Sequence, residues 1–411
     1  MSKIKDACLA DGGYISYSWA KSHMKILTES AGRLKKSKPL RGLTLGFCMQ
    51  MTKETSVLLV CAKELGAKVV ACGGNPLTTH DDVAAFLDSR GIITYAWSDQ
   101  SKSEYEWCQD QVLSHKPQIL VDDGGDLNTK AHFDNRFKTL KVIGATEETT
   151  TGVNRYAAMQ HKVQLRYPII AVNNAKTKMM FDNRYGTGQS TIDGYLRAMN
   201  LIFASKTVVV SGYGWLGRGV VQRCSGMGSK VIVTEIDPIK ALEAHMDGFD
   251  VMPMDRAAKV GDIFITCTGM TSVIRKEHLL QMKDGAVVGN VGHFDVEIDA
   301  KFLLSRSTTR KIRPNLDECV MPGGKKIYLV SKGRVANLVA SEGHPPEVMA
   351  MSFSNQLHCI LYLVKHHKKM KPRVYDVPKE IDDHVALDVL HASRIKIDKL
   401  TKRQTKYLHS W

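Results

Sequence analysis

Residues 208–237 read VVVSGYGWLGRGVVQRCSGMGSKVIVTEID and carry the strongest structural signal in this chain. A β-branched run stops at a glycine-rich turn, passes into a stretch of helical period, and leads to a second β-branched run that ends in an acid. This is the order of a dinucleotide-binding unit. A lone G-x-G-x-x-G can be only a tight turn, but two strands and an acid in register favour cofactor binding.

Each glycine of the turn has a physical task. Gly212 lets the chain turn sharply off the strand, Gly214 lets backbone N–H groups approach a pyrophosphate, and Gly217 lets the helix lie close on the sheet. The phosphates would lie at the positive end of that helix. Glu235 follows the second strand, where a carboxylate accepts from both ribose hydroxyls and repels a 2′-phosphate. The pattern therefore favours NAD over NADP.

The composition is that of an ordinary globular protein with more than one domain. With 411 residues, of which 43% are hydrophobic and 24% charged, we expect two or three domains. No apolar run approaches the roughly 20 residues that span a bilayer, and the first residues lack the apolar core of a signal peptide. We therefore expect a cytoplasmic protein without a membrane partner. Nine cysteines with no C-x-x-C pair predict reduced thiols and no metal site.

The net charge of +15 suggests attraction to polyanions, but the pattern does not support it. The densest basic run, residues 365–373, lies where a helix is expected to end and has no interleaved aromatic residues. A solvated linker explains this run better than a nucleic-acid site.

Strand-like and helix-like stretches alternate on both sides of a central connection. This alternation predicts an α/β protein with two doubly wound parallel sheets and a small helical C-terminal segment. We expect strands at 43–48, 67–72, 92–97, 118–121, 141–143 and 169–172, and helices at 52–65, 81–89, 190–203 and 346–367.

The same pattern predicts a division into domains. A substrate-binding domain would cover 1–183 and an NAD-binding Rossmann domain 184–344. A helix at 345–370 would return to the first domain, and 371–411 would form the C-terminal segment. The two crossings, near residues 183 and 345, would form a hinge over a cleft.

Polar residues gather after the expected strands of the first sheet, where ligands bind in open parallel sheets. Helix capping explains several of the threonines. It does not readily explain Asp123 together with Glu148, because charges near a buried sheet end need partners or a function. Lys178 and Asp182 have the spacing of a simple helical ion pair. A histidine after a strand is more often a packed polar residue, but His293 and His344 fall at expected cleft positions, so we favour a function.

Eight stretches resemble the S-adenosyl-L-homocysteine hydrolase family, in the order of that family and over nearly the full length. The Trp-Leu-Gly-Arg form of the glycine turn resembles a compact branch common in archaea and some bacteria. The matching stretches are MTKET (51–55), DDGGDL (122–127), EETTTG (147–152), TKMMFDNRYG (177–186), GYGWLGRG (212–219), TEIDPIKALEAHMDGF (234–249), GHFDVEID (292–299) and NLVASEGHPPEVMAMSFSNQ (337–356).

The resemblance implies reversible hydrolysis of S-adenosyl-L-homocysteine to adenosine and L-homocysteine with tightly held NAD, which serves the methyl cycle. Water attacks a thioether on an unactivated 5′ carbon poorly. Oxidation of the 3′ hydroxyl to a ketone acidifies the 4′ hydrogen, so that homocysteine is eliminated, water is added, and the ketone is reduced again. The family also implies a homotetramer or a homodimer.

The resemblance implies a catalytic role for six residues. Lys178 and Asp182 resemble the pair that helps remove the 3′ hydroxyl proton, a task that suits a lysine if its surroundings tune its pKa. Asp123 resembles the base near the 4′ hydrogen, and His293 resembles the histidine beside the ribose and the nicotinamide. The full set is Lys178, Asp182, Asp123, His293, Glu148 and Asn183.

It also implies binding residues on the substrate and cofactor sides. Glu54 would accept a hydrogen bond from the exocyclic amine of adenine, and His344 would contact the same base at the crossing. The substrate set is Thr52, Glu54, Gln50, His344 and Thr55. The cofactor set is Gly212, Gly214, Trp215, Leu216, Gly217, Glu235, Thr149, Thr150, Thr151, Asn290 and Asn337.

Three departures from the family pattern leave alternatives open. Gln50 stands where the family commonly has a histidine, and a glutamine cannot shuttle a proton at neutral pH. His80 replaces a common glutamine, and the chain ends without the tail that longer relatives extend to a neighbour's NAD. The alternatives are an S-inosylhomocysteine hydrolase, a non-catalytic NAD-binding regulator, and an ordinary NAD-dependent dehydrogenase.

Overall fold

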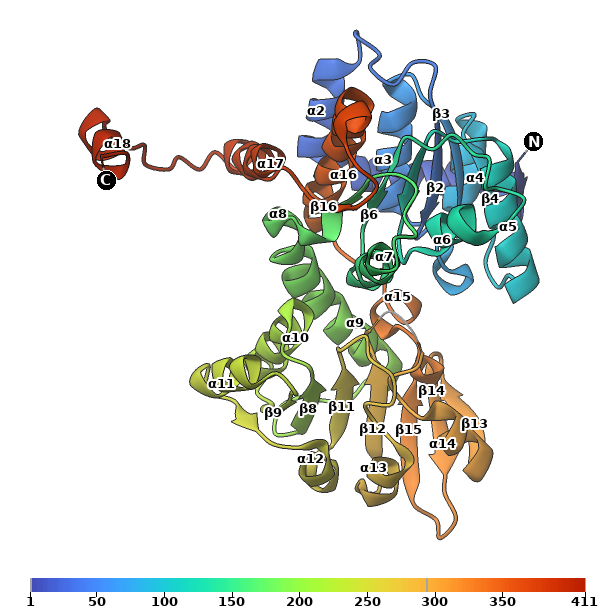
Figure 1. Cartoon of the computed structure of the whole chain (residues 1–411). Coiled ribbons are helices and arrows are strands. Elements are labelled where there is room, and N and C mark those ends of the chain that lie inside the picture. The colour runs from blue at the N-terminus through green and yellow to red at the C-terminus, as the bar shows by residue number, and fades with distance from the viewer. Residues whose placement is uncertain (1, 293–294, 411) are drawn as a thin grey trace.

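The computed structural model describes residues 2–292 and 295–410 and contains two α/β units joined by helices that pass between them (Figure 1). Each unit is built on its own eight-stranded sheet. This arrangement confirms the predicted fold class of two sheets with helices on their faces.

The first sheet is parallel throughout and has the strand order β1-β4-β3-β2-β5-β6-β7-β16. Its central strands are buried on both faces, which is why they read as continuous apolar runs. The strands are β1 (Lys3–Ile4), β2 (Thr44–Met49), β3 (Lys68–Gly73), β4 (Ile93–Ala96), β5 (Ile119–Asp122), β6 (Gly144–Glu147), β7 (Ile169–Ala171) and β16 (Val374–Asp376).

Helices cover both faces of this sheet and begin at residues suited to helix starts. Ser101 and Glu104 form a complete capping box at the start of one helix, and Thr52 and Thr149 cap two others. The helices of this unit are α1 (Ala10–His23), α2 (Lys25–Leu34), α3 (Lys53–Glu64), α4 (Asp81–Ser89), α5 (Lys102–Ser114), α6 (Asp126–Phe133) and α7 (Thr150–His161).

The second sheet has the order β10-β9-β8-β11-β12-β15-β14-β13. Its first six strands are parallel, and β14 pairs antiparallel with both β15 and β13. The strands are β8 (Thr207–Ser211), β9 (Lys230–Thr234), β10 (Asp250–Val251), β11 (Ile263–Thr266), β12 (Ala286–Asn290), β13 (Thr308–Arg313), β14 (Leu316–Val320) and β15 (Lys326–Val330). The helices are α10 (Trp215–Gly226), α11 (Pro238–Met246), α12 (Met254–Val260), α13 (Lys276–Gln281), α14 (Ala300–Arg306) and α15 (Ala336–Val339).

Two connections join the units (Figure 1). The first runs through α8 (Lys176–Met179), the π-helical turn η4 (Asp182–Gly186) and α9 (Thr187–Met199). The second is the 21-residue helix α16 (Pro346–His366), which returns from the second unit to pack on α2 and α3. A Cβ on Gly219 would lie 1.9 Å from the carbonyl oxygen of Arg184, so only glycine lets α10 approach the η4 turn this closely.

Three details of the sequence prediction are corrected. The strand expected at 141–143 begins instead at Gly144 and runs to Glu147, because the buried small residues lie downstream of the apolar signal. The first sheet gains β16 from the C-terminal segment, although its sequence there is short and partly exposed. The second sheet ends in an antiparallel hairpin of β13 and β14 instead of continuing in parallel.

The C-terminal segment leaves the body of the molecule. Helix α17 (Lys379–Ala392) packs on α16 and α2, whereas α18 (Lys402–Leu408) has no buried residue and lies at the end of an exposed arm (Figure 1). Within residues 2–292 and 295–410, none of the helices is both long and apolar enough to cross a membrane.

Candidate functional site

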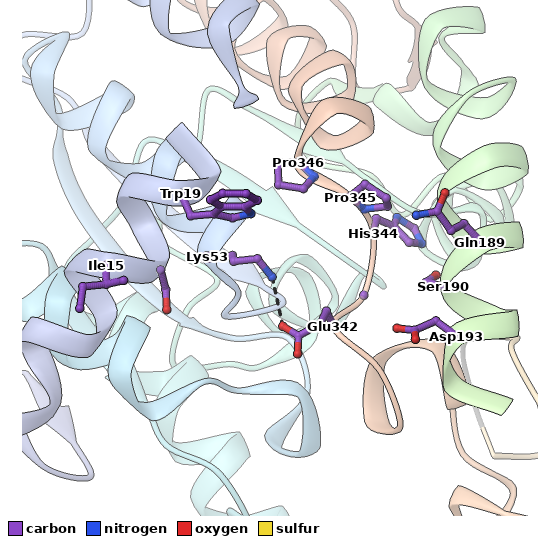
Figure 2. A pocket seen from close by; sticks show the side chains of 12 residues that line it. Ile15, Trp19, Lys53, Gln189, Ser190, Asp193, Glu342, His344, Pro345 and Pro346 are labelled. Carbon is purple, nitrogen blue, oxygen red and sulfur yellow. Dashed lines mark hydrogen bonds and ion pairs between the residues drawn. The ribbon is translucent and has the colours of Figure 1, made fainter. Parts of the chain in front are cut away.

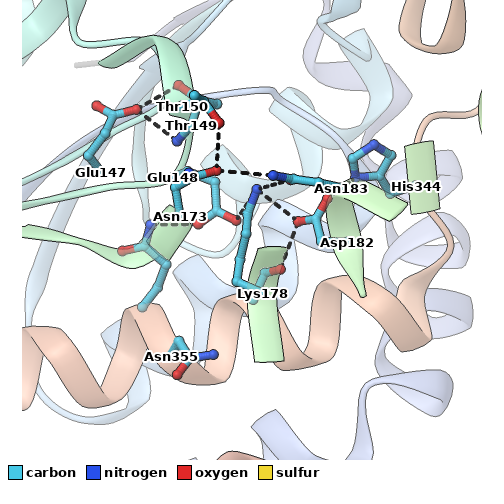
Figure 3. A network of polar contacts seen from close by, with 12 residues as sticks. Glu147, Glu148, Thr149, Thr150, Asn173, Lys178, Asp182, Asn183, His344 and Asn355 are labelled. Atoms are coloured by element: carbon cyan, nitrogen blue, oxygen red, sulfur yellow. Dashed lines mark hydrogen bonds and ion pairs between the residues drawn. The ribbon is translucent and has the colours of Figure 1, made fainter. Parts of the chain in front are cut away.

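The Lys178 ammonium is the centre of a buried polar cluster (Figure 3). Its Nζ donates to Asn183 Oδ1 at 2.8 Å and lies 3.4 Å from Asp182 Oδ2 and 3.8 Å from Glu148 Oε1. The carboxylates come from the η4 turn and from the end of β6, which are distant in sequence. The structure therefore brings together four of the residues that the sequence analysis selected.

The local backbone explains how Lys178 is held. Helix α8 has only four residues, and its first N–H groups, from Lys176 and Thr177, donate to the carboxylate of Asp382 at 2.7 and 2.9 Å. The following π-helical turn presents Asp182 and Asn183 on consecutive positions. Single-turn π segments are frequent at functional sites, because they redirect side chains without ending a helix.

The charged groups of the cluster shift one another's pKa values. Burial disfavours the charge on Lys178, but Asp182, Glu148 and Asp123 outweigh burial and raise its pKa. Burial also opposes ionisation of Asp182, yet Lys178 and His344 lower the pKa of that carboxyl. Burial raises the pKa of Glu148 to about 8, against the attraction of Lys178. At neutral pH the site thus contains an ammonium and an ionised Asp182, while Glu148 holds a proton more readily than a free carboxyl group.

Helix α16 supplies two site residues that the sequence analysis did not select. Ser352 Oγ donates to Asp182 Oδ2 at 2.7 Å, and Gln356 Nε2 donates to Glu148 Oε2 at 2.6 Å. Both side chains are buried. The available signal was a pair of polar residues four positions apart in an apolar helix, a spacing that places them on one face.

Asp123 follows the last residue of β5 and lies at the same sheet edge as Glu148. Its backbone N–H donates to the Cys48 carbonyl at 3.0 Å, which fixes the loop after β5 to the end of β2. Its negative charge helps raise the pKa of both Lys178 and Glu148, so its carboxylate is near enough to act on the cluster.

The predicted substrate residues line the loop before α3 and its first turn. Thr52 caps the helix, and Thr55 and Glu54 are buried behind it. Glu54 Oε1 is buried and has no hydrogen-bond partner among the described residues, although Lys53 Nζ lies 3.4 Å away. Gln50 Oε1 accepts a short hydrogen bond from Thr78 Oγ1. A buried acceptor without a donor is suited to binding one from a ligand.

His344 connects the crossing to the buried polar cluster around Lys178. Its Nδ1 lies 2.7 Å from Asp182 Oδ1, and its Nε2 lies 3.0 Å from Thr187 Oγ1. Because a carboxylate oxygen only accepts, Nδ1 carries a hydrogen that points to Asp182. The sequence analysis predicted only a contact with adenine for His344, which stays a prediction; its pairing with Asp182 is an additional contact.

The glycine turn after β8 has the geometry that a pyrophosphate requires. Gly212 adopts φ +100°, and Gly214 precedes the first turn of α10, where Trp215 and Leu216 lie. A Cβ on Gly217 would lie 2.0 Å from the Gly212 carbonyl oxygen. Glu235 Oε2 accepts from the Tyr213 N–H at 2.7 Å, so this acid lies beside the turn.

The remaining predicted cofactor residues differ in the hydrogen-bond partners of their side chains. Asn337 is buried and its Oδ1 has no hydrogen-bond partner in the part of the chain that the structure describes, whereas Asn290 Oδ1 accepts from Thr266 Oγ1 and the Gly292 N–H. Thr149 caps α7, Thr150 donates to Asn173 Oδ1 at 3.2 Å, and Thr151 lies in the first turn of α7. His293 lies outside the described residues, and its role stays a prediction.

A cavity of about 580 Å³ lies beside the second crossing (Figure 2). Trp19 and Lys53 line one side of it, and Gln189 and Asp193 of α9 line the other. Of the predicted site residues only His344 lines this cavity. The cavity therefore adjoins the buried polar cluster around Lys178 and does not contain it.

Comparison with known proteins gives a consistent result. Residues 1–142 match the family model described as S-adenosyl-L-homocysteine hydrolase, and residues 183–343 match the model of its NAD binding domain. An adenosylhomocysteinase of Sulfurisphaera tokodaii is 52% identical over 410 residues, which cover 100% of this chain and 98% of that protein. An adenosylhomocysteinase of Saccharolobus solfataricus is 51% identical, with 100% and 98% covered. An S-inosyl-L-homocysteine hydrolase of Methanopyrus kandleri is 48% identical, with 99% and 97% covered.

Proposed function

The chain belongs to the S-adenosyl-L-homocysteine hydrolase family, and we propose that it hydrolyses S-adenosyl-L-homocysteine reversibly to adenosine and L-homocysteine with NAD. The observation that carries this proposal is the buried cluster of Lys178, Asp182, Asn183 and Glu148 with Asp123 beside it. An ordinary dehydrogenase of a small hydroxy acid is set aside by the family membership.

The residues of the second sheet fit NAD. The positive φ of Gly212, the missing side chains at Gly214 and Gly217, and the acid Glu235 suit a pyrophosphate and an adenine ribose. The buried, unpartnered Oδ1 of Asn337 suits a donor such as the carboxamide of nicotinamide. When bound, NAD supplies reversible hydride transfer at the 3′ carbon.

The residues of the first sheet would move protons at the ribose. We assign Lys178, held by Asp182 and Asn183, to the 3′ hydroxyl, and Asp123 to the hydrogen on the 4′ carbon. Because the pKa of Lys178 is raised, its ammonium must release a proton before the amine accepts the one from the hydroxyl. Glu148, whose pKa is about 8, can exchange a proton near neutral pH.

A coupled thiol assay tests the function directly. Purified protein is incubated with S-adenosyl-L-homocysteine and adenosine deaminase, which removes adenosine and draws the reaction toward hydrolysis. We expect stoichiometric release of homocysteine thiol with no net NADH. If neither the adenosyl nor the inosyl thioether releases thiol while NAD stays bound, the chain is a non-catalytic relative.

Gln50 provides a second test, because it stands where the family commonly has a histidine. We expect Gln50→His to preserve turnover or to raise it by up to about tenfold, since an imidazole adds a proton carrier at the 5′ side. Gln50→Leu, which keeps the size but removes the hydrogen bond with Thr78, serves as the matched control and should lower turnover. Steady-state thiol release measures both. A loss of activity in Gln50→His would show that the glutamine amide itself is needed.

A further inference from the structure

Two buried carboxyl groups beneath the site share one hydroxyl group. Asp122 ends β5 and Glu147 ends β6, and the two residues are paired across these neighbouring strands. Both are fully buried. Tyr156 Oη of α7 lies 3.1 Å from Asp122 Oδ2 and 3.0 Å from Glu147 Oε2. The steps assigned above to the ribose use neither carboxyl group.

The hydrogen atoms available do not satisfy both contacts of Tyr156. A phenol has one hydrogen, so it donates to only one of two carboxylates. If both were ionised, one of the contacts would join two oxygens without a hydrogen between them, in a site closed to water. A second hydrogen must therefore lie on one of the carboxyl groups.

The surrounding donors show which carboxyl group holds it. Asp122 Oδ2 also accepts from the Asn128 N–H at 2.8 Å and Nδ2–H at 3.1 Å, and Oδ1 accepts from the Asp123 N–H at 3.1 Å. Both oxygens of Asp122 thus face donors, with the Asp123 N–H shared between Oδ1 and the Cys48 carbonyl. Glu147 Oε2, in contrast, has Tyr156 as its one recorded partner among the described residues. The hydrogen fits only on Glu147 Oε2, which donates to Tyr156, while Tyr156 donates to Asp122.

The other oxygen of Glu147 joins two loops of the site. Oε1 accepts from the Gly124 N–H at 2.8 Å, and from the Thr149 N–H and Oγ1–H at 3.0 and 2.8 Å (Figure 3 shows the contacts with Thr149). Gly124 follows Asp123, and Thr149 follows Glu148. One carboxyl group therefore fixes the backbone next to both residues.

We propose that Glu147 is a neutral carboxylic acid in the working protein and is a positioning residue that holds the loops of Asp123 and Glu148 in register. This role rests on the proposed function of those two residues. A neutral Glu147 keeps its contacts with Gly124, Thr149 and Tyr156 and adds no negative charge beside Asp122 and Asp123. A Cβ on Gly152 would lie 2.1 Å from the Glu147 carboxyl carbon, so only glycine at this position leaves room for the carboxyl group.

Burial and the neighbouring negative charges raise the pKa of Glu147, which favours its neutral form. Burial is the largest cause that raises its pKa, and the negative charges of Asp122 and Asp123 add to it. Burial raises the pKa of Asp122 to about 7, although its contacts with Asn128 and Tyr156 oppose this. From α6 and α7, Asp126 and Arg155 face the same region, and Arg155 donates to the Gly124 carbonyl. Because a raised pKa delays ionisation, Glu147 keeps its proton to a higher pH than a free carboxyl group does.

Replacing each acid by its amide distinguishes the roles of the two carboxyl groups. In Glu147→Gln the amide oxygen accepts from Gly124 and Thr149, and the amide N–H donates to Tyr156, which reproduces the neutral acid. We expect kcat/KM within about threefold of the wild type. Asp122→Asn places an N–H against an N–H donor, and we expect a loss of about tenfold or more. Glu147→Ala, which removes the shared acceptor, should lose as much, so that rescue by glutamine identifies a hydrogen-bonding role.

Infrared difference spectroscopy of the full-length protein without substrate detects the proton itself. In the difference spectrum between the wild type and Glu147→Gln at pH 7 we expect a carboxylic-acid C=O band of the wild type, and this band should be retained in Asp122→Asn. A difference spectrum without this band, or a large loss of kcat/KM in Glu147→Gln alone, would overturn the proposal. Because the band is measured without substrate, it is independent of the thiol assay for hydrolysis.

Discussion

Replacement of Lys178 by alanine is expected to abolish oxidation of the 3′ hydroxyl, with a loss on the order of 10³-fold or more in its rate. The side chain is buried, and its ammonium faces Asp182, Glu148 and Asn183. Removing it leaves no amine at the 3′ hydroxyl and leaves two carboxyl groups without their cation. Mixing the NAD-loaded protein with adenosine and following the absorbance of the reduced nicotinamide measures this step alone.

Two further variants separate the possible roles of this lysine. Lys178→Arg keeps the positive charge but cannot accept a proton at usable pH, so it should be nearly as slow as alanine if Lys178 acts as a base. Because the pKa of Lys178 is raised, the wild-type rate of 3′ oxidation should increase with pH as the amine forms. Lys176→Ala, on the exposed side of the same helix, should leave the rate unchanged. Normal oxidation in Lys178→Ala would remove this residue from the mechanism.

Much of the fold could be predicted from the sequence, because local sequence patterns indicate its strands and helices. The residues 230–234 and 81–89 form a strand and a helix with the bounds that their apolar patterns and turns indicate. The strand β6 was misplaced because Gly144-Ala145-Thr146-Glu147 has little β propensity and is a strand only through its neighbours β5 and β7. The pairing of β16 with β7 also depends on a distant segment, which no local pattern reveals.

The site could be predicted only in part, for a related reason. Asp123, Glu148, Lys178 and Asp182 follow strands or lie in a matched motif, so the sequence marks them, and the structure brings them together. The contacts of the α16 residues with this cluster depend on the angle at which that helix crosses back to the first unit. The sequence does not predict that angle. The shared hydrogen of Glu147 likewise follows from three side chains that meet only in the folded protein.

The family relationship does not decide whether the nucleobase of the substrate is adenine or hypoxanthine. We expect Glu54 to determine which of the two bases is bound. Its buried Oε1 has no hydrogen-bond partner among the described residues. The 6-amino group of adenine donates to such an oxygen, whereas the 6-oxo group of hypoxanthine is an acceptor and is repelled. Lys53 Nζ, at 3.4 Å from the same oxygen, would favour the oxo group, but it also pairs with Glu342 at 3.3 Å. The carboxylate is therefore the stronger determinant.

We expect the wild-type protein to prefer the S-adenosyl over the S-inosyl thioether by on the order of 10²-fold in kcat/KM, because an unpaired buried polar group rejects the wrong partner strongly. Glu54→Gln keeps the shape but can present an N–H to the oxo group, so this preference should shrink to about tenfold or less. Lys53→Met removes the competing cation and should keep or increase the preference for adenosyl. Thiol release from both thioethers measures all three proteins. A wild-type preference for the inosyl thioether that Lys53→Met abolishes would assign the specificity to Lys53 and identify an S-inosylhomocysteine hydrolase.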